Sequence, residues 1–189
     1  SVGVRRICFY HLIRTGRAKS LEDQTLTPGQ TRLAVDMIIE KTDDFVKKAL
    51  LDESLTVDNH ADGPYILTRM IKEKKQRYEA AKQLLLANGG NKIGEKIVCV
   101  GWDGSVYPDQ FWRNYSLGNI RDKALRQIWN NPDEPILNKL RNKSEFADCR
   151  CKRCRWFDLC KGNFRFLGDK TDYEHWLNEP ACYLADDEI

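Results

Sequence analysis

Clustered cysteines constrain this sequence more than any other feature. Four of them fall within residues 149–160, and three more lie elsewhere in the 189-residue chain. An odd count of seven cysteines, in a sequence that opens without an export signal, argues against a disulfide framework. We therefore expect a metal centre in this part of the chain. The seven positions are Cys8, Cys99, Cys149, Cys151, Cys154, Cys160 and Cys182.

The spacing of four cysteines predicts one shared centre. Cys151 and Cys154 form a C-x2-C knuckle, Cys160 follows after five residues, and Cys182 follows after 21 more. Four thiolates suit either an iron–sulfur cluster or structural zinc. Zinc ribbons usually carry two such knuckles, so one knuckle favours iron–sulfur over zinc and over unligated thiols. Cys149 is a rival for Cys151, but its spacing fits less well. The basic side chains expected to lower the thiol pKa values are Lys152, Arg153, Arg155 and Lys161.

Composition excludes several classes of protein. A net charge of +3 is too small and too scattered for a nucleic-acid footprint. The composition, 41% apolar and 31% charged, is that of a soluble globular protein. No apolar run approaches the roughly 20 residues of a membrane span, and no signal peptide is evident. We therefore expect a cytoplasmic location, without nucleic acid or membrane as a partner.

The first half predicts alternating strands and helices. Residues 4–13 suggest a buried strand, and the sequence Thr-Pro-Gly-Gln at 27–30 is a capped helix start. That helix is expected to reach about Leu51, followed by a short strand at 55–57 and a second long helix at 65–87. This order indicates parallel βα units. Two units alone leave unpaired strand edges, so this half is expected to belong to something larger.

The second half predicts a small α+β domain. Residues 96–102 and 105–107 are two short strands, and Asp103-Gly104 between them is a strong hairpin signal. Short helices are expected near 123–129 and 135–142. The tail from residue 146 is rich in Cys, Gly, aromatic and charged residues, with little apolar periodicity. Its fold is therefore expected to need an additional cross-link, which a metal cluster would supply.

Several motifs carry a family resemblance. They are Gly-Ser-Val-Tyr-Pro-Asp-Gln-Phe-Trp at 104–112, Ser-Leu-Gly-Asn-Ile at 116–120, Ile-Trp at 128–129, the cysteine run, and Pro-Ala-Cys-Tyr-Leu at 180–184. Together they resemble the C-terminal auxiliary-cluster domain, called SPASM or twitch, of radical SAM enzymes. The resemblance is strongest to the branch that remodels tetrapyrroles. This branch comprises siroheme-derived deacetylases, haem d1 biosynthesis enzymes and Fe-coproporphyrin decarboxylases.

The resemblance implies a fold and a ligand set. Residues 6–12 and 55–63 are similar to late strands of the family's partial TIM barrel. Residues 1–91 are thus expected to be the last βα units of that barrel, and residues 92–189 an auxiliary-cluster domain. One auxiliary [4Fe–4S] cluster would be bound by Cys151, Cys154, Cys160 and Cys182. A second auxiliary site is broken, because Asp109 and Phe164 replace two of its cysteines and Cys99 is at most a remnant.

One family motif is absent. Radical SAM chemistry needs a C-x3-C-x2-C loop for its own [4Fe–4S] cluster, and these 189 residues contain none. The resemblance therefore implies the C-terminal half of an enzyme that removes acetate or propionate carbons from a tetrapyrrole. An N-terminal half, in the same or a separate chain, would supply SAM binding and the second cluster, and an electron donor is also needed. The chain alone is not expected to cleave SAM. Alternatives are a non-catalytic iron–sulfur protein and a structural zinc protein.

Four further side chains are candidates for binding substrate or SAM. Functional groups of parallel barrels gather at the C-terminal ends of strands, and all four lie there in the predicted fold. Arginines would pair with the carboxylates of a tetrapyrrole, and a histidine could bind its iron. The alternatives are solvated charges and hydrogen-bonded structural histidines. Cys8 and Cys99 are expected to be buried thiols. The candidates are His11, Arg14, Arg17 and His60.

Overall fold

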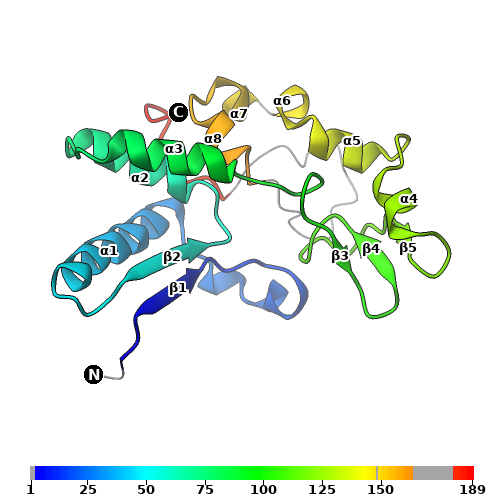
Figure 1. The fold of residues 1–189 in the computed structure, drawn as a ribbon, viewed down its shortest axis with the longest axis horizontal. Helices are drawn as coiled ribbons and strands as arrows, with labels where there is room; N and C mark the ends of the chain where they lie inside the picture. The colour runs from blue at the N-terminus through cyan, green and yellow to red at the C-terminus, as the bar shows by residue number, and fades with distance from the viewer. Residues whose placement is uncertain (1–2, 148, 164–180) are drawn as a thin grey trace.

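The computed structural model describes residues 3–147, 149–163 and 181–189 as a mixed α/β fold (Figure 1). Within these residues, no helix is long and apolar enough to cross a bilayer. The first half contains β1 (Arg6–Tyr10), two 3-10 turns (Gly16–Ser20 and Glu22–Gln24), α1 (Pro28–Lys47), β2 (Glu53–Val57), α2 (Asp62–Lys72) and α3 (Tyr78–Asn88). The second half contains β3 (Cys99–Val100), β4 (Ser105–Tyr107), β5 (Gly118–Asn119), α4 (Leu125–Trp129), α5 (Pro135–Arg141), α6 (Lys143–Phe146), α7 (Cys149–Arg153) and α8 (Phe157–Cys160).

Strands β1 and β2 pair in parallel, as the βα pattern predicts. Their register runs from Arg6 opposite Glu53 to Tyr10 opposite Val57. The prediction of a buried strand at 4–13 is wrong, because β1 is shorter and mostly exposed. Its only strand neighbour within the described residues is β2, so Tyr10 remains 70% exposed. For the same reason the prediction that Cys8 is buried is wrong, since its thiol is exposed on β1.

Helix α1 begins as the sequence predicts. The backbone N–H of Gln30 donates to Thr27 Oγ1 (3.3 Å), and the backbone N–H of Thr27 donates to Gln30 Oε1 (2.9 Å). The helix ends at Lys47, before the expected Leu51. Ala49 adopts a left-handed conformation with φ of 54°, and the backbone N–H of the next residue turns back to the Phe45 carbonyl (2.9 Å). This reversal is a Schellman ending, which terminates the helix.

The single long helix predicted at 65–87 is two helices. Lys74 has a φ of 51°, and the N–H of Lys75 donates to the Met70 carbonyl (2.9 Å), which ends α2. Helix α3 then returns alongside α2 (Figure 1). A Cβ on Gly63 would lie 3.0 Å from Leu85 Cδ2, so these two helices touch closely. One continuous helix would carry Leu85 away from this apolar contact, whereas the break at Lys74 allows it.

The second half forms a three-stranded antiparallel sheet in the order β3-β4-β5. The hairpin predicted at Asp103-Gly104 is confirmed, with a φ of 88° at Gly104. Asp103 Oδ1 accepts from the backbone N–H of Ser105 (3.0 Å), which fixes the turn. The two short helices expected near 123–129 and 135–142 are confirmed as α4 and α5.

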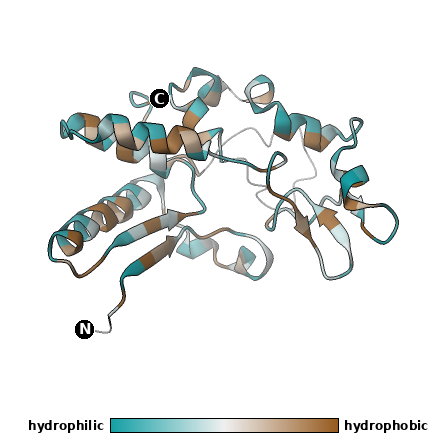
Figure 2. Cartoon of the chain, viewed as in Figure 1, coloured by the Kyte–Doolittle hydropathy of each residue, from teal (hydrophilic) through white to brown (hydrophobic). Residues whose placement is uncertain are grey.

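Two apolar clusters form the core. The first joins residues from before and after residue 91, and the second lies under α5. Figure 2 shows apolar residues on β1, β2, α2 and α3. The boundary near residue 91 stays a prediction, because the first cluster is shared between the two proposed domains. The first cluster comprises Val35, Ala61, Tyr65, Leu67, Trp156, Leu159, Tyr183 and Leu184, and the second comprises Ile93, Trp112, Ile136 and Leu140.

A buried glutamate fastens the segment 181–189 to the first half. Glu188 is 3% exposed and receives two hydrogen bonds from the Arg32 guanidinium, at 2.7 and 2.9 Å. Lys72 of α2 donates to the same carboxylate (3.0 Å). The indole N–H of Trp156 donates to the Glu188 carbonyl (2.8 Å). The hydrogen bonds from Arg32 lower the pKa of Glu188 to about 2, so this carboxylate is ionised in the folded chain.

We predict that Glu188→Gln destabilises the chain by about 3 kcal/mol at pH 7, because it leaves Arg32 without its buried partner. The wild-type stabilisation is fully present above about pH 4.5, the ordinary glutamate pKa, and is lost as pH falls toward about 2. Urea unfolding at several pH values measures this. Glu53→Gln is the control, since its ion pair with Arg6 is exposed and contributes about 1 kcal/mol or less. Equal pH dependence in wild type and Glu188→Gln would contradict the prediction.

Candidate metal centre

Four predicted ligands lie around one small pocket. Cys151 comes from α7, Cys154 from the turn that follows, Cys160 from the end of α8, and Cys182 from the segment 181–189. The pocket wall is otherwise mainly apolar. The structure thus brings together the four residues singled out by spacing, across 31 residues of sequence. The side chain of Cys149, the rival ligand, lies outside the described part. The other lining residues are Ala61, Arg150, Phe157, Gly162, Asn163, Leu184 and Ile189.

The backbone shapes this pocket through tight turns. The N–H of Cys154 donates to the Cys151 carbonyl (3.1 Å), which brings the knuckle cysteines onto one turn. After α8, Lys161 and Gly162 are both left-handed, with φ of 53° and 70°. This curvature points the Gly162 N–H at Cys160 Sγ, at 3.3 Å. Amide donors to sulfur stabilise thiolate charge and tune iron–sulfur clusters, so the turn suits a ligand cysteine.

Burial and nearby positive charge have opposite effects on the pKa of the Cys154 thiol. Burial raises the pKa of the Cys154 thiol, which outweighs the lowering by the Trp156 backbone donor and by nearby arginines. Arg155, one of the basic neighbours, lowers the pKa of Cys154 as expected, but burial has the larger effect and the pKa is raised on balance. A buried thiol of this kind ionises when a metal binds it, so cluster binding and deprotonation are coupled.

Arg150 is a residue that the sequence reasoning missed. Burial alone would lower the pKa of its guanidinium, but hydrogen bonding to Cys182 and pairing with Asp186 raise that pKa on balance. Arg150 Nε lies 3.2 Å from Asp186 Oδ1, and the guanidinium also donates to the Leu184 carbonyl. This fixed positive charge offsets the negative charge of a thiolate-bound cluster. One arginine among many in a basic stretch gives no sequence signal for such a position.

The donor set fits an iron–sulfur cluster. All four candidate ligands are thiols, and they surround a common pocket. Within the described residues, no three Cys, His, Asp or Glu side chains converge closely enough to hold one metal ion. In a cubane cluster each thiolate binds a different iron, so its sulfurs lie farther apart than around a single zinc.

Buried asparagines join the cysteine segments to the rest of the fold. The Asn91 N–H donates to the Cys160 carbonyl (2.9 Å), and Asn91 Nδ2 donates to the Gly162 carbonyl (3.0 Å). Beside it, Gly90 has no room for a side chain, since a Cβ would lie 2.4 Å from the Leu159 carbonyl oxygen. Residues 90–91 therefore hold the turn that carries Cys160.

The loop after β2 is fastened in the same way. Asn59 Nδ2 donates to the Ala181 carbonyl (3.0 Å), next to Cys182. Asn163 donates to Asn59 Oδ1 and accepts from the His60 backbone N–H. The end of β2 is thus tied to both cysteine-bearing segments. Asparagines are common in any loop, so the sequence alone does not distinguish Asn91 and Asn163.

The residues predicted to bind substrate lie in different parts of the structure. His11 and Arg14 line a cavity of about 390 Å³ at the C-terminal end of β1. His60 lines a different cavity of about 900 Å³. Arg17 lies in the exposed 3-10 turn and lines neither cavity. Asn59 is part of both walls, so the two cavities adjoin at the end of β2.

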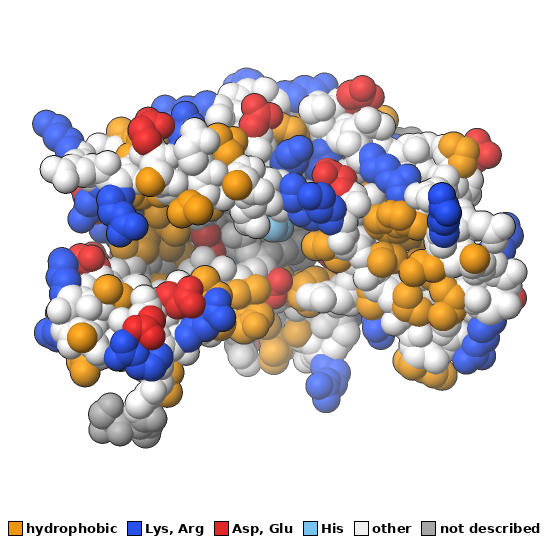
Figure 3. Space-filling model, viewed as in Figure 1, with side chains coloured by type: hydrophobic (Ala, Val, Ile, Leu, Met, Phe, Trp, Pro, Cys, Tyr) orange, Lys and Arg blue, Asp and Glu red, His pale blue; other side chains and the backbone are white. Residues whose placement is uncertain are grey.

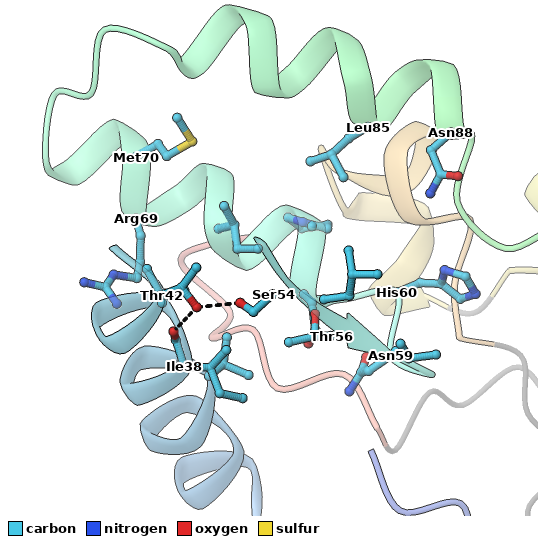
Figure 4. Close-up of a pocket in the computed structure, with 18 of the residues that line it drawn as sticks. Ile38, Thr42, Ser54, Thr56, Asn59, His60, Arg69, Met70, Leu85 and Asn88 are labelled. Atoms are coloured by element: carbon cyan, nitrogen blue, oxygen red, sulfur yellow. Dashed lines mark hydrogen bonds between the residues drawn. The ribbon is translucent and has the colours of Figure 1, made fainter. Parts of the chain in front are cut away.

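The larger cavity lies between two layers of the fold. Figure 3 shows a hollow between the α2–α3 layer and the α1–β2 layer, with apolar side chains around it. Figure 4 shows Thr42 of α1, Met70 of α2 and Leu85 of α3 around this space, with His60 at one end. Its wall mixes apolar side chains with charged ones such as Asp43, Arg69 and Glu73. The smaller cavity holds two of the predicted substrate residues, His11 and Arg14, and is therefore the candidate for binding a substrate.

His11 belongs to a hydrogen-bonded group of three side chains. Its Nε2 lies 2.9 Å from Asp62 Oδ2, and the hydroxyl of Tyr183 donates to Asp62 Oδ1 (2.6 Å). Burial and the Asp62 carboxylate raise the pKa of Tyr183, so its hydroxyl keeps its proton. Asp62 and Tyr183 are 4% and 3% exposed. No sequence motif indicates that these three residues meet.

Comparison with known proteins identifies the cysteine domain. Residues 92–155 match the model of an iron–sulfur cluster-binding domain, SPASM. The matched residues include Cys151 and Cys154, whereas Cys160 and Cys182 lie beyond them. No solved structure matches the chain significantly.

Two relatives cover almost the whole chain. Fe-coproporphyrin III synthase of Methanosarcina barkeri is 41% identical over 98% of this chain and 47% of the relative. Pre-heme d1 synthase of Dinoroseobacter shibae is 29% identical over 97% of this chain and 46% of the relative. A cysteine-type anaerobic sulfatase-maturating enzyme of Clostridium perfringens is 38% identical over 81 residues, 40% of this chain and 20% of that relative. The chain spans about half the length of the first two relatives. The resemblance to SPASM enzymes of the tetrapyrrole branch is confirmed.

We predict that Cys160→Ser abolishes stable cluster binding, whereas Cys8→Ser does not, because the Cys8 thiol lies on β1 away from the pocket. After anaerobic reconstitution, iron and sulfide analysis should give about four of each per wild-type chain. The prediction fails if both variants lose iron equally, or if wild type binds about one zinc and no sulfide.

We predict that Asn91→Ala destabilises the chain by about 2 kcal/mol and speeds release of iron to a chelator, because the Gly162 carbonyl and the Ile93 N–H lose a buried partner. Asn131→Ala is the matched control, since it removes only one exposed turn contact. Chelation kinetics followed by visible absorbance measure the effect. Equal release rates in the two variants would show that Asn91 does not support the cysteine turn.

Proposed function

We propose that this chain is the C-terminal half of a radical SAM enzyme that removes acetate or propionate side-chain carbons from a tetrapyrrole in haem or haem d1 biosynthesis. The supporting observation is the match of nearly the whole chain to two relatives whose names specify such products. The four thiols around one pocket support the same proposal. The location is proposed to be cytoplasmic.

One auxiliary [4Fe–4S] cluster is proposed, bound by Cys151, Cys154, Cys160 and Cys182. Such a cluster exchanges single electrons with the reaction or with a donor protein. The chain's own contribution is the fixed charge of Arg150 and the Gly162 amide beside the sulfur atoms.

The absence of a second auxiliary site is supported by Asp109. Its Oδ1 accepts from the backbone N–H groups of Phe111 and Trp112, both at 2.8 Å. This side chain is 6% exposed and holds a turn. A carboxylate engaged in this way is a poor substitute for a ligand cysteine. Phe164, which replaces the other cysteine, lies outside the described residues.

The cavity beside β1 is the proposed substrate side. Arg14 is placed to pair with a carboxylate, and the apolar residues Leu12 and Ile13 offer a surface for a macrocycle. At about 390 Å³ the cavity takes part of a tetrapyrrole rather than all of it. The rest would lie against the N-terminal half.

An N-terminal radical SAM half is the proposed partner. It would supply the C-x3-C-x2-C loop, its [4Fe–4S] cluster and SAM, which together generate the radical that abstracts hydrogen from the substrate. Residues 1–91 would complete its partial TIM barrel. The exposed β1 supports this, since Phe9 and Tyr10 are 39% and 70% exposed on a strand with one described neighbour. Apolar side chains on an open edge suit pairing with further strands.

A second candidate is a non-catalytic iron–sulfur protein derived from such an enzyme. The four thiols around one pocket favour it equally, since an electron carrier needs only the cluster. It would carry electrons without binding a tetrapyrrole, so substrate binding separates the two candidates.

We predict that the cluster-loaded chain binds ferric coproporphyrin III, and that Arg14→Gln weakens binding about tenfold by removing a charged partner of a carboxylate. Arg17→Gln is the control, because Arg17 lies outside the cavity. Fluorescence quenching or absorbance titration measures both. Failure of the wild-type chain to bind any tetrapyrrole would favour the electron carrier, and equal effects of the two variants would remove Arg14 from the site.

A further inference from the structure

The group His11–Asp62–Tyr183 has a geometry that a merely structural histidine does not need. Its members come from the end of β1, the first residue of α2, and the residue after Cys182. Both oxygens of the Asp62 carboxylate are engaged, one by His11 Nε2 (2.9 Å) and one by the Tyr183 hydroxyl (2.6 Å). Asp62 is therefore held in one orientation, and it fixes the plane of the His11 ring.

The other ring nitrogen, Nδ1, has no hydrogen-bond partner among the described residues, because Asp62 engages Nε2. His11 lines the 390 Å³ cavity, whereas Asp62 does not. Nδ1 is therefore the ring nitrogen available to a molecule that enters the cavity. The His11 side chain is 19% exposed, which leaves part of the ring accessible. With Nε2 donating its proton to Asp62, Nδ1 has a free lone pair.

A carboxylate behind a histidine is the usual arrangement for a metal ligand. The carboxylate fixes the tautomer, orients the ring and makes the coordinating nitrogen more basic. His11 does not line the cysteine pocket, so it would not be a ligand of a cluster bound there. A metal would therefore arrive with the molecule that enters the cavity.

We propose that His11 Nδ1 binds the central iron of a metallated tetrapyrrole, and that Asp62 and Tyr183 are positioning residues for this ligand. The inference rests on the proposed function and deepens it, because it makes the site selective for the iron-bearing form of the substrate. His11 would bind iron on one face of the macrocycle, while Arg14 in the same cavity pairs with a side-chain carboxylate.

The position of Tyr183 links this ligand to the cysteine site. Tyr183 follows Cys182 directly in sequence, so the segment that supplies the fourth cysteine also anchors the carboxylate behind His11. Tyr183→Phe would remove that anchor while retaining the ring packed against Tyr65, whose centroid is 5.2 Å away. Its effect on the iron spectrum, without loss of cluster, would report positioning rather than packing.

The test compares ferric coproporphyrin III with metal-free coproporphyrin III as probes of the full, cluster-loaded chain. We expect the iron form to bind about tenfold more tightly, with the absorption and EPR spectra of an imidazole-bound iron. His11→Ala should lose both the preference and these spectra, and added imidazole should restore the spectra. Asp62→Asn should reduce the preference to about threefold without abolishing binding of the metal-free form. His60→Ala, in the other cavity, is the matched histidine control.

The outcomes distinguish failure of His11 as the iron ligand from failure of the proposed tetrapyrrole function. If both probes bind wild type equally, or if His11→Ala retains the imidazole spectrum, the iron ligand is not His11 and only this inference falls. Loss of the spectrum in His60→Ala alone would likewise assign the ligand elsewhere. If neither probe binds the wild-type chain, the proposed tetrapyrrole function fails together with the inference. Iron and sulfide analysis of every variant confirms that the cluster is retained in each comparison.

Discussion

The rest of this structure depends on buried hydrogen bonds that join the end of β2 to the cysteine-bearing segments. Asn59, Asn91 and Asn163 are each buried, and together they tie the strand end to Cys160 on one side and to Ala181 on the other. Buried amides of this kind are costly to leave unpaired, so the two halves fold against one another as a specific pair of surfaces. The cysteine pocket and the cavity beside β1 are consequently held at fixed positions relative to each other.

Local features of this chain were predictable from sequence. The Thr27 cap, the Asp103-Gly104 hairpin and the spacing from Cys151 to Cys182 each depend on residues whose chemistry is expressed nearby or through one shared ligand. The break at Lys74 was not predictable, because a lysine in a left-handed turn carries no sequence signal and follows from the packing of Leu85. Local propensity yields to tertiary contact at that point.

Prediction from sequence was also incomplete for the candidate substrate site, because its contacts join distant parts of the chain. His11 and Arg14 were placed beyond a strand end by the βα pattern, and both line one cavity. The partners of His11 were not foreseen, because Asp62 lies 51 residues away from it and Tyr183 lies 121 residues from Asp62. The exposure of β1 was also missed, since an apolar strand was assumed to have neighbours on both sides. Such contacts depend on the complete fold, which no single segment encodes.

The segment 181–189 brings together features that are otherwise far apart. Cys182 completes the pocket, Tyr183 anchors Asp62, and Glu188 binds Arg32 and Lys72. During synthesis this segment leaves the ribosome after every other part of the site. Until it is made, three cysteines lack their fourth partner, and Arg32 and Lys72 lack the Glu188 carboxylate. The four-thiol pocket and the contacts of Asp62 and Arg32 can therefore be completed only after this segment has been synthesised.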